Sequence, residues 1–172
     1  MDDSVEVGEN AEMKNWCSFE NCIYPVRVLI FMGNRKRMCE NVHFAMVDKN
    51  VFSDPMKMDF AANFAKQWCM EFGEEDNSVH SECLSVFSEK NGQRMWIIRI
   101  GSFDGSIDDT ALVSHECLHA AIGIMEYCGV NEKHPFEALC YLHEAIFKKA
   151  IEFMFGRVGM LRKKDDILRE NV

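Results

Sequence analysis

The sequence predicts an α+β domain, in which a small and mostly antiparallel sheet packs on two helices. Three observations lead to this prediction. Apolar runs of strand length lie in the first hundred residues, an Asn-Gly pair at 91–92 separates two of them, and two long stretches with helical spacing follow residue 106. Strands that precede helices, rather than alternate with them regularly, are typical of this class.

The first strand is expected at 24–32, where an apolar run ends at a Gly-Asn pair. A second apolar segment, 42–47, is a candidate partner for it. The segment 59–72 instead predicts a helix with an aromatic side in the core. Its aromatic residues recur at helical spacing: Phe60, Phe64, Trp68 and Phe72.

The segments 83–87 and 95–100 predict an antiparallel hairpin, because they flank Asn91-Gly92, the strongest short-range hairpin signal. The loop 101–105 then leads to Ser106-Ile107-Asp108-Asp109, a pattern typical of a capping box at the start of a helix. The hairpin strand just before this helix is expected to present an open edge, to which an extended peptide can add.

The helix after Ser106 carries the most informative motif, His115-Glu116-Cys117-Leu118-His119. Two imidazoles four residues apart emerge on one helix face, about 6 Å from each other, close enough to bind one zinc ion beside Glu116. Apolar flanks predict a helix buried on nearly all sides, where an unpaired polar side chain costs about 1–3 kcal/mol. A bound metal removes that cost, so the motif favours a zinc site over a chance match.

A third ligand is expected on the next helix, because catalytic zinc sites use three protein side chains and leave one position for water. After a turn at 129–131, a helix is expected from about residue 134 to about residue 155. Glu137 lies in its first turn, eighteen residues after His119, which is enough for an antiparallel return. Glu137 is therefore the preferred third ligand. The alternatives are His134, His143 and Glu144.

The pattern His115-Glu116-x-x-His119 followed by Glu137 resembles the gluzincin branch of the zincin metallopeptidases. Thermolysin-like members of that branch carry the third zinc ligand as a Glu on the next core helix. The stretch from Ser114 to Tyr141 is also similar to small, uncharacterised metallopeptidases of bacteriophages. The resemblance covers about residues 106–155. It departs at Tyr141, where thermolysin-like enzymes usually have an Asp that orients a zinc-bound His.

This resemblance implies a minimal zincin-like domain that hydrolyses peptide bonds with zinc as cofactor and a protein or peptide as substrate. Glu116 is then the general base that takes a proton from the zinc-bound water and passes it to the leaving amine. If the chain is phage-encoded, it acts on a host or viral protein in the host cytoplasm. The oxygen that becomes negative at the tetrahedral stage of hydrolysis needs a further hydrogen-bond donor beside the zinc. The candidates are His80, His134, Tyr141 and His143.

A second hypothesis is a non-catalytic protein that keeps the zinc-stabilised fold and acts by binding, for example as an inhibitor of a host enzyme. The presence of Glu116 distinguishes the two hypotheses, because a protein that only binds its target has no use for a general base. The intact motif therefore favours the enzyme.

Length and composition fit one domain, because 172 residues with 48% hydrophobic content can bury one ordinary core. We expect this domain at 16–160, between an acidic and disordered start at 1–15 and a charged tail at 161–172. The net charge of −9 argues against direct nucleic-acid binding. Neither a membrane-spanning run nor a signal peptide is recognisable, so the expected location is the cytoplasm, without a membrane partner.

The cysteines are expected to be reduced thiols rather than a disulfide framework. Several lie inside apolar helical patterns, and no Cys-x-x-Cys pair occurs. The eight positions are Cys17, Cys22, Cys39, Cys69, Cys83, Cys117, Cys128 and Cys140.

Overall fold

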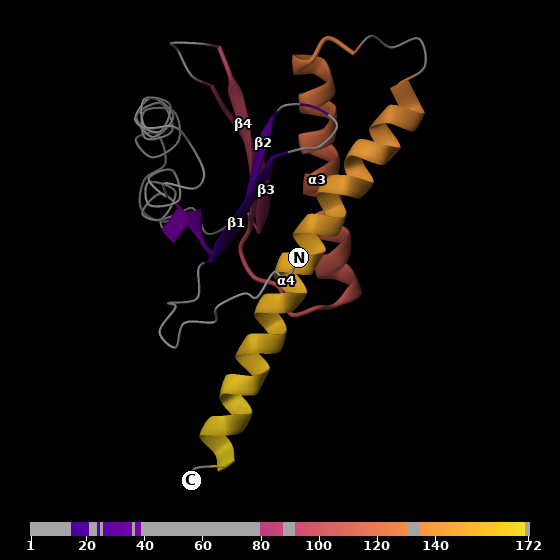
Figure 1. Cartoon of the computed structure of the whole chain (residues 1–172). Coiled ribbons are helices and arrows are strands. Elements are labelled where there is room, and N and C mark those ends of the chain that lie inside the picture. The colour runs from indigo at the N-terminus through magenta and orange to yellow at the C-terminus, as the bar shows by residue number, and fades with distance from the viewer. Residues whose placement is uncertain are drawn as a thin grey trace, which may run out of the picture.

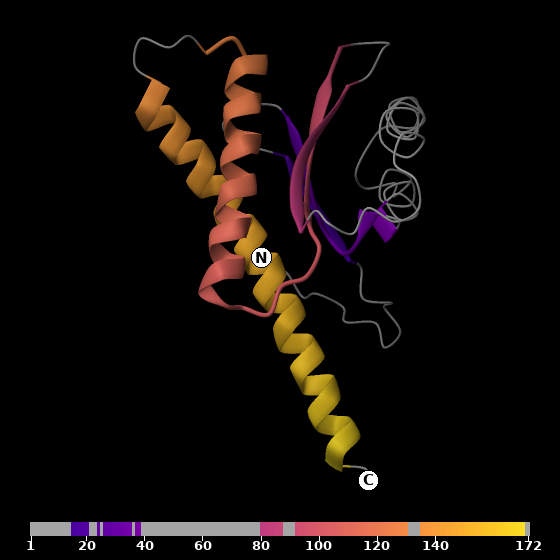
Figure 2. The ribbon, with the colours of Figure 1, turned by 180° about the vertical axis from the view of Figure 1, so that it is seen from behind.

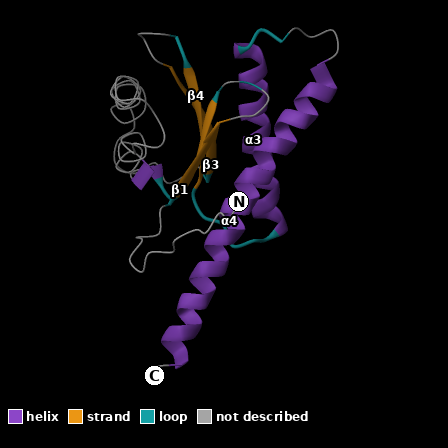
Figure 3. Cartoon of the chain, in the orientation of Figure 1, coloured by secondary structure: helices purple, strands orange, loops and turns teal. Residues whose placement is uncertain are grey.

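A computed structural model gives the fold of the chain and describes residues 15–20, 24, 26–35, 37–38, 80–87, 92–130 and 135–170. These residues form a four-stranded mixed sheet with two helices against one of its faces (Figures 1 and 3). The predicted α+β class is therefore confirmed. The elements expected at 42–47 and 59–72, and nearly all of the acidic first segment, lie outside the described residues.

The strands lie in the order β1-β2-β4-β3 across the sheet. Their bounds are Trp16–Glu20 for β1, Arg27–Met32 for β2, Ser81–Phe87 for β3 and Arg94–Ile100 for β4. β1 pairs with β2 and β3 pairs with β4 in antiparallel fashion, whereas β2 and β4 are parallel. The sheet is therefore mostly antiparallel, and the hairpin of 83–87 with 95–100 is confirmed.

The central strands β2 and β4 are buried on both faces, which explains their continuous apolar sequences. Ile30 and Ile98 belong to the core shared with the helices, while Phe31 and Ile97 are equally buried on the opposite face. β2 begins three residues later than the expected position 24. The Val26 N–H donates to the Tyr24 carbonyl over 2.7 Å, a tight turn that precedes the strand ladder.

Helix α3 (Ile107–Tyr127) begins where the capping pattern predicts. The Ser106 hydroxyl accepts a hydrogen bond from the Asp109 N–H at 3.1 Å. The reciprocal half of the box is absent, because the Asp109 carboxylate accepts from the Asp104 N–H at 2.7 Å. The Ser106 N–H donates instead to the side chain of Asp104. The cap therefore fixes the loop after β4 to the first turn of α3.

Helix α4 (Pro135–Glu170) returns across α3 and extends well past the sheet (Figures 1 and 2). The expected end near residue 155 is wrong, and the segment predicted as a charged tail is helical as far as Glu170. Gly156 does not stop the helix, because a helical glycine costs only about 1 kcal/mol relative to alanine. Val158, beyond that glycine, still packs against the core.

A buried ion-pair cluster ties β3 to its neighbours on the face away from the helices. The Glu82 carboxylate accepts hydrogen bonds from the guanidinium groups of Arg35 and Arg99. Arg99 is 2% exposed, and it also donates to the carbonyl of Gly33. Burial alone would raise the pKa of Glu82, but the hydrogen bonds and charges of the two arginines outweigh it and lower that pKa.

Five cysteines lie in the described part of the chain, and all five are free, as expected for Cys17, Cys83, Cys117, Cys128 and Cys140. The other three lie outside the described residues. Burial raises the pKa of Cys17 and of Cys83 to about 12. These two thiols are therefore protonated at neutral pH and poor nucleophiles. No helix in the described ranges is both long and apolar enough to cross a membrane.

Candidate metal and catalytic site

His115 and His119 lie one turn apart on α3, with their Nε2 atoms 3.0 Å from each other. Both side chains are exposed, and their rings meet edge to face with centroids 4.6 Å apart. Two imidazole nitrogens on one tetrahedral zinc ion lie about 3.3 Å apart, given Zn–N bonds of about 2.0–2.1 Å. The pair therefore needs little adjustment to share a metal ion that arrives from solvent.

The histidine-bearing side of α3 faces solvent, so the expectation of a helix buried on nearly all sides is wrong. Leu118 and Ile122 on that side are each 39% exposed. The cost of burying unpaired polar groups therefore applies to Glu116 but not to the histidines. A hydrophobic sequence around the motif does not bury it, because only one side of α3 packs on the sheet and α4.

Glu116 points toward the sheet and is 6% exposed. Its Oε1 accepts a hydrogen bond of 2.7 Å from the Ser81 hydroxyl, at the first residue of β3. Because successive helix residues are rotated by about 100°, Glu116 occupies the flank of α3 between the histidine side and the buried side. The carboxylate thus lies at the junction of helix and sheet edge.

A cleft of about 380 Å³ runs between β3 and α3 and contains both Glu116 and His119. The rest of its lining comes from the sheet: Ser81, Glu82, Cys83, Leu84, Ser85 and Trp96. The residues of β3 that alternate toward α3 are small, which leaves space beside the carboxylate.

The strand next to this cleft is β3, and among the described strands it pairs with β4 alone. We expected the open edge on the strand just before the helix. That expectation is wrong, because β4 lies between β2 and β3 and is paired on both sides. The edge available to an extended peptide belongs to the first strand of the hairpin.

Gly123 allows α3 to approach the sheet closely at Trp96, a residue that also lines the cleft. A Cβ atom at this position would lie 2.7 Å from Nε1 of Trp96. Trp96 is 3% exposed, and its ring also contacts the ring of Tyr127, with centroids 5.6 Å apart. The indole therefore has little freedom to move away from an added methyl group.

Gly123→Ala is expected to lower the free energy of unfolding by about 1–3 kcal/mol, because the added methyl overpacks the contact with Trp96. Gly156→Ala in α4 is the matched control: nothing lies within 4 Å of its added Cβ, so it should be neutral or stabilise by up to about 1 kcal/mol. Urea unfolding of both variants measures the difference. Equal effects would contradict a close helix-sheet contact at Gly123.

Glu137 lies in the first turn of α4 and is exposed. Its Oε1 accepts a hydrogen bond from the Tyr141 hydroxyl at 3.3 Å. Within the described ranges, no three or more His, Cys, Asp or Glu side chains are grouped so that they could hold a metal ion. The structure thus brings His115 and His119 together but does not bring Glu137 to them.

The contact between Ser114 and His143 sets the alignment of the two helices. Nε2 of His143 lies 3.1 Å from the carbonyl oxygen of Ser114. Because both helices rise about 1.5 Å per residue, an antiparallel return places Glu137 at about the level of His119 along the axes. The helices diverge toward the connection between them, and this divergence carries the first turn of α4 away from α3 (Figures 1 and 2).

The alternative ligands and oxyanion donors lie at different places. The ring of His143 stacks on Phe147, with centroids 5.8 Å apart, and its Nε2 contacts Ser114 rather than the histidine pair. His80 is exposed and directly precedes the cleft residue Ser81. His134 lies outside the described residues.

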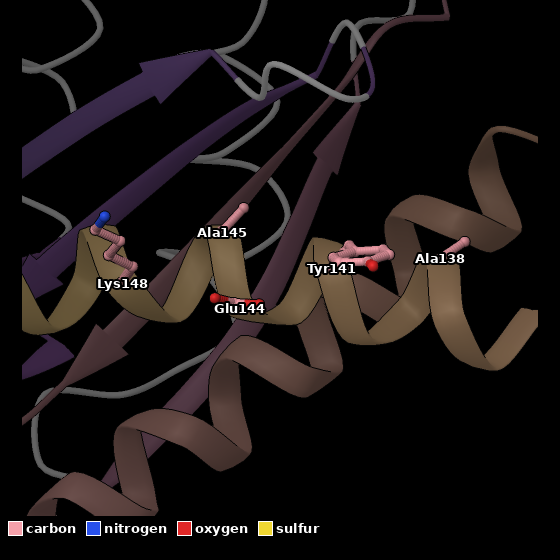
Figure 4. A pocket seen from close by; sticks show the side chains of 5 residues that line it. All are labelled: Ala138, Tyr141, Glu144, Ala145 and Lys148. Carbon is pink, nitrogen blue, oxygen red and sulfur yellow. The ribbon is translucent and has the colours of Figure 1, made fainter.

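Tyr141 and Glu144 line an open groove of about 600 Å³ along α4. Figure 4 shows the five lining residues on successive turns of that helix, with Ala138, Ala145 and Lys148 as the others. The groove is formed by side chains of α4 alone. It is therefore separate from the cleft that contains Glu116 and His119.

Ser81 is the residue of this site that sequence reasoning did not single out. Its contact with Glu116 joins positions 35 residues apart, and no local pattern signals it. Comparison of the chain with models of protein families, with curated proteins and with solved structures found no match. Any function must therefore be argued from the residues themselves.

Proposed function

We propose that this chain is a zinc-dependent peptidase of the zincin type, with His115 and His119 as zinc ligands and Glu116 as general base. One observation carries the proposal: two histidine nitrogens lie 3.0 Å apart on α3, and the intervening glutamate opens into the same cleft as His119. Zinc at such a site activates water and polarises a carbonyl group. Donor set and spacing both fit this ion.

Glu116 is suited to proton transfer by its surroundings. One carboxylate oxygen is held by Ser81, while among the described residues Oε2 has no hydrogen-bond partner. Oε2 is therefore left to accept a proton from a water molecule in the cleft. An extended peptide added to the edge of β3 would pass directly beside this carboxylate, which supports a protein or peptide substrate.

Glu137 remains the preferred third ligand in this proposal. Along the helix axes it lies at about the level of His119, but the first turn of α4 diverges from α3. The first turns of α4 would therefore have to move toward α3 to bring the Glu137 carboxylate to the histidines. Glu144, His143 and His134 are the alternatives. Free thiols at the five described cysteines support action in the cytoplasm, and the resemblance to phage metallopeptidases supports a host or viral protein as target.

The wild-type protein is expected to bind one zinc ion per chain, and His115→Ala and His119→Ala are each expected to abolish binding, because two remaining ligands hold zinc weakly. Glu137→Gln should weaken binding if Glu137 is the third ligand. Elemental analysis after gel filtration in zinc-containing buffer gives the stoichiometry. His80→Ala, an exposed histidine near the cleft, is the control that should retain the metal.

Two other outcomes of this experiment are informative. A wild-type chain that binds no zinc would overturn the proposal. If Glu137→Gln keeps its zinc but Glu144→Gln or His143→Ala loses it, the third ligand would be assigned to Glu144 or His143. The roles of the other site residues would be unchanged.

A zinc-stabilised interaction protein is the second candidate, and one observation favours it. The hydrogen bond from Ser81 to Glu116 joins β3 to α3, so the buried carboxylate has a structural use even without catalysis. Such a protein would bind its target through a surface and need no proton transfer. Replacement of Glu116 separates the two candidates.

A further inference from the structure

We propose that Ser81 is a positioning residue, which orients the Glu116 carboxylate for proton transfer. This inference rests on the proposed peptidase function. The Ser81 hydroxyl donates to Oε1 of Glu116 at 2.7 Å, and Glu116 is 6% exposed at the wall of the cleft. Among the described residues this is the one hydrogen bond made by the Glu116 side chain.

Ser81 is itself held rigidly by the sheet. It lies opposite Ile100 in the ladder of β3 and β4. On the residue before it, the carbonyl of His80 accepts a hydrogen bond from the Gly101 N–H at 2.8 Å. On the residue after it, Glu82 is bound by two arginines on the opposite face of the sheet. The hydroxyl therefore projects from a strand that is fixed on both sides of Ser81.

A fixed donor matters here because a glutamate side chain has three rotatable bonds, and its last torsion is broad. With Oε1 held by Ser81, the plane of the carboxylate is defined and Oε2 is kept in one place. Prearranged geometry of this kind lowers the barrier to a reaction, and a misplacement of about 1 Å can cost about 10²-fold in rate. If the Ser81 hydroxyl only joined β3 to α3, its removal would lower the stability of the fold but would leave kcat unchanged.

The test compares three serine variants of the zinc-loaded, full-length protein. The probe is a fluorogenic peptide selected from a library by cleavage with the wild type. Ser81→Ala should lower kcat by about 10–100-fold, with KM and zinc content unchanged, because it misplaces the base without touching a ligand. Ser81→Thr keeps the hydroxyl and should recover most of the rate. Ser18→Ala removes a hydroxyl from β1, at the opposite edge of the sheet and outside the cleft, and should keep the wild-type kcat.

The mechanism also predicts non-additivity with Glu116. In a Glu116→Gln background, Ser81→Ala should cause no further loss of kcat, because the group that it positions is gone. A wild-type kcat in Ser81→Ala, or an equal loss of kcat in Ser18→Ala, would overturn the positioning role. Hydrolysis by the wild type would still uphold the peptidase in either case. A zinc-loaded wild type that cleaves no peptide in the library would overturn both.

Discussion

Glu116→Gln is expected to reduce peptide hydrolysis by about 10²–10⁴-fold, because it removes the carboxylate that accepts the water proton. The replacement is nearly isosteric, and its amide oxygen can still accept the hydrogen bond from Ser81. Fold and zinc content should therefore be retained. Turnover of a cleavable peptide, measured beside zinc content and thermal unfolding, gives the result.

Glu126→Gln is a matched control, because Glu126 is an exposed glutamate on the same helix, away from the cleft. It should leave turnover unchanged. The same two variants can be compared in a biological assay, such as toxicity on expression. Equal potency of Glu116→Gln and wild type would contradict the peptidase proposal and favour a zinc-stabilised interaction protein.

The local part of the site was predictable from sequence, because a helix converts spacing directly into geometry. Residues four apart must emerge on one side of α3, and the nitrogens of His115 and His119 do lie together. The start of α3 was equally predictable, since the cap at Ser106 depends on neighbouring residues. Neither feature requires knowledge of how the helices pack.

Whether Glu137 lies close to the two histidines was not predictable from spacing along the chain. The length of the connection allows an antiparallel return, and α4 does return across α3. Rotation and divergence of two helices, however, depend on which side chains meet, such as His143 against Ser114. Spacing along the chain contains no direct signal for such contacts.

The sheet shows the same division between local and distant pairing. The pairing of β3 with β4 was predictable because an Asn-Gly pair lies between the two segments in the sequence. The parallel pairing of β2 with β4 joins segments far apart in the chain, and no turn residue marks it. The open edge therefore had to be located from the structure, and with it the position of Ser81 beside Glu116.

Glu82→Gln is expected to lower the free energy of unfolding by about 3–5 kcal/mol, because it breaks the ion pair between Glu82 and the buried guanidinium of Arg99. Glu152→Gln is the control. Glu152 pairs with Lys149 on the surface of α4, where both side chains are more than half exposed, and its loss should cost less than about 1 kcal/mol. Denaturant unfolding at neutral pH measures both variants.

The lowered pKa of Glu82 gives this prediction a pH dependence with a definite sign. A carboxyl group whose pKa is lower in the folded state stabilises the fold above its ordinary value of 4.5, and this contribution is lost as pH falls through the folded-state pKa. The difference between wild type and Glu82→Gln should therefore be largest near neutral pH and shrink on acidification below about 4.5. A difference independent of pH, or no larger than that of Glu152→Gln, would mean that the strand ladder alone holds β3 beside the cleft.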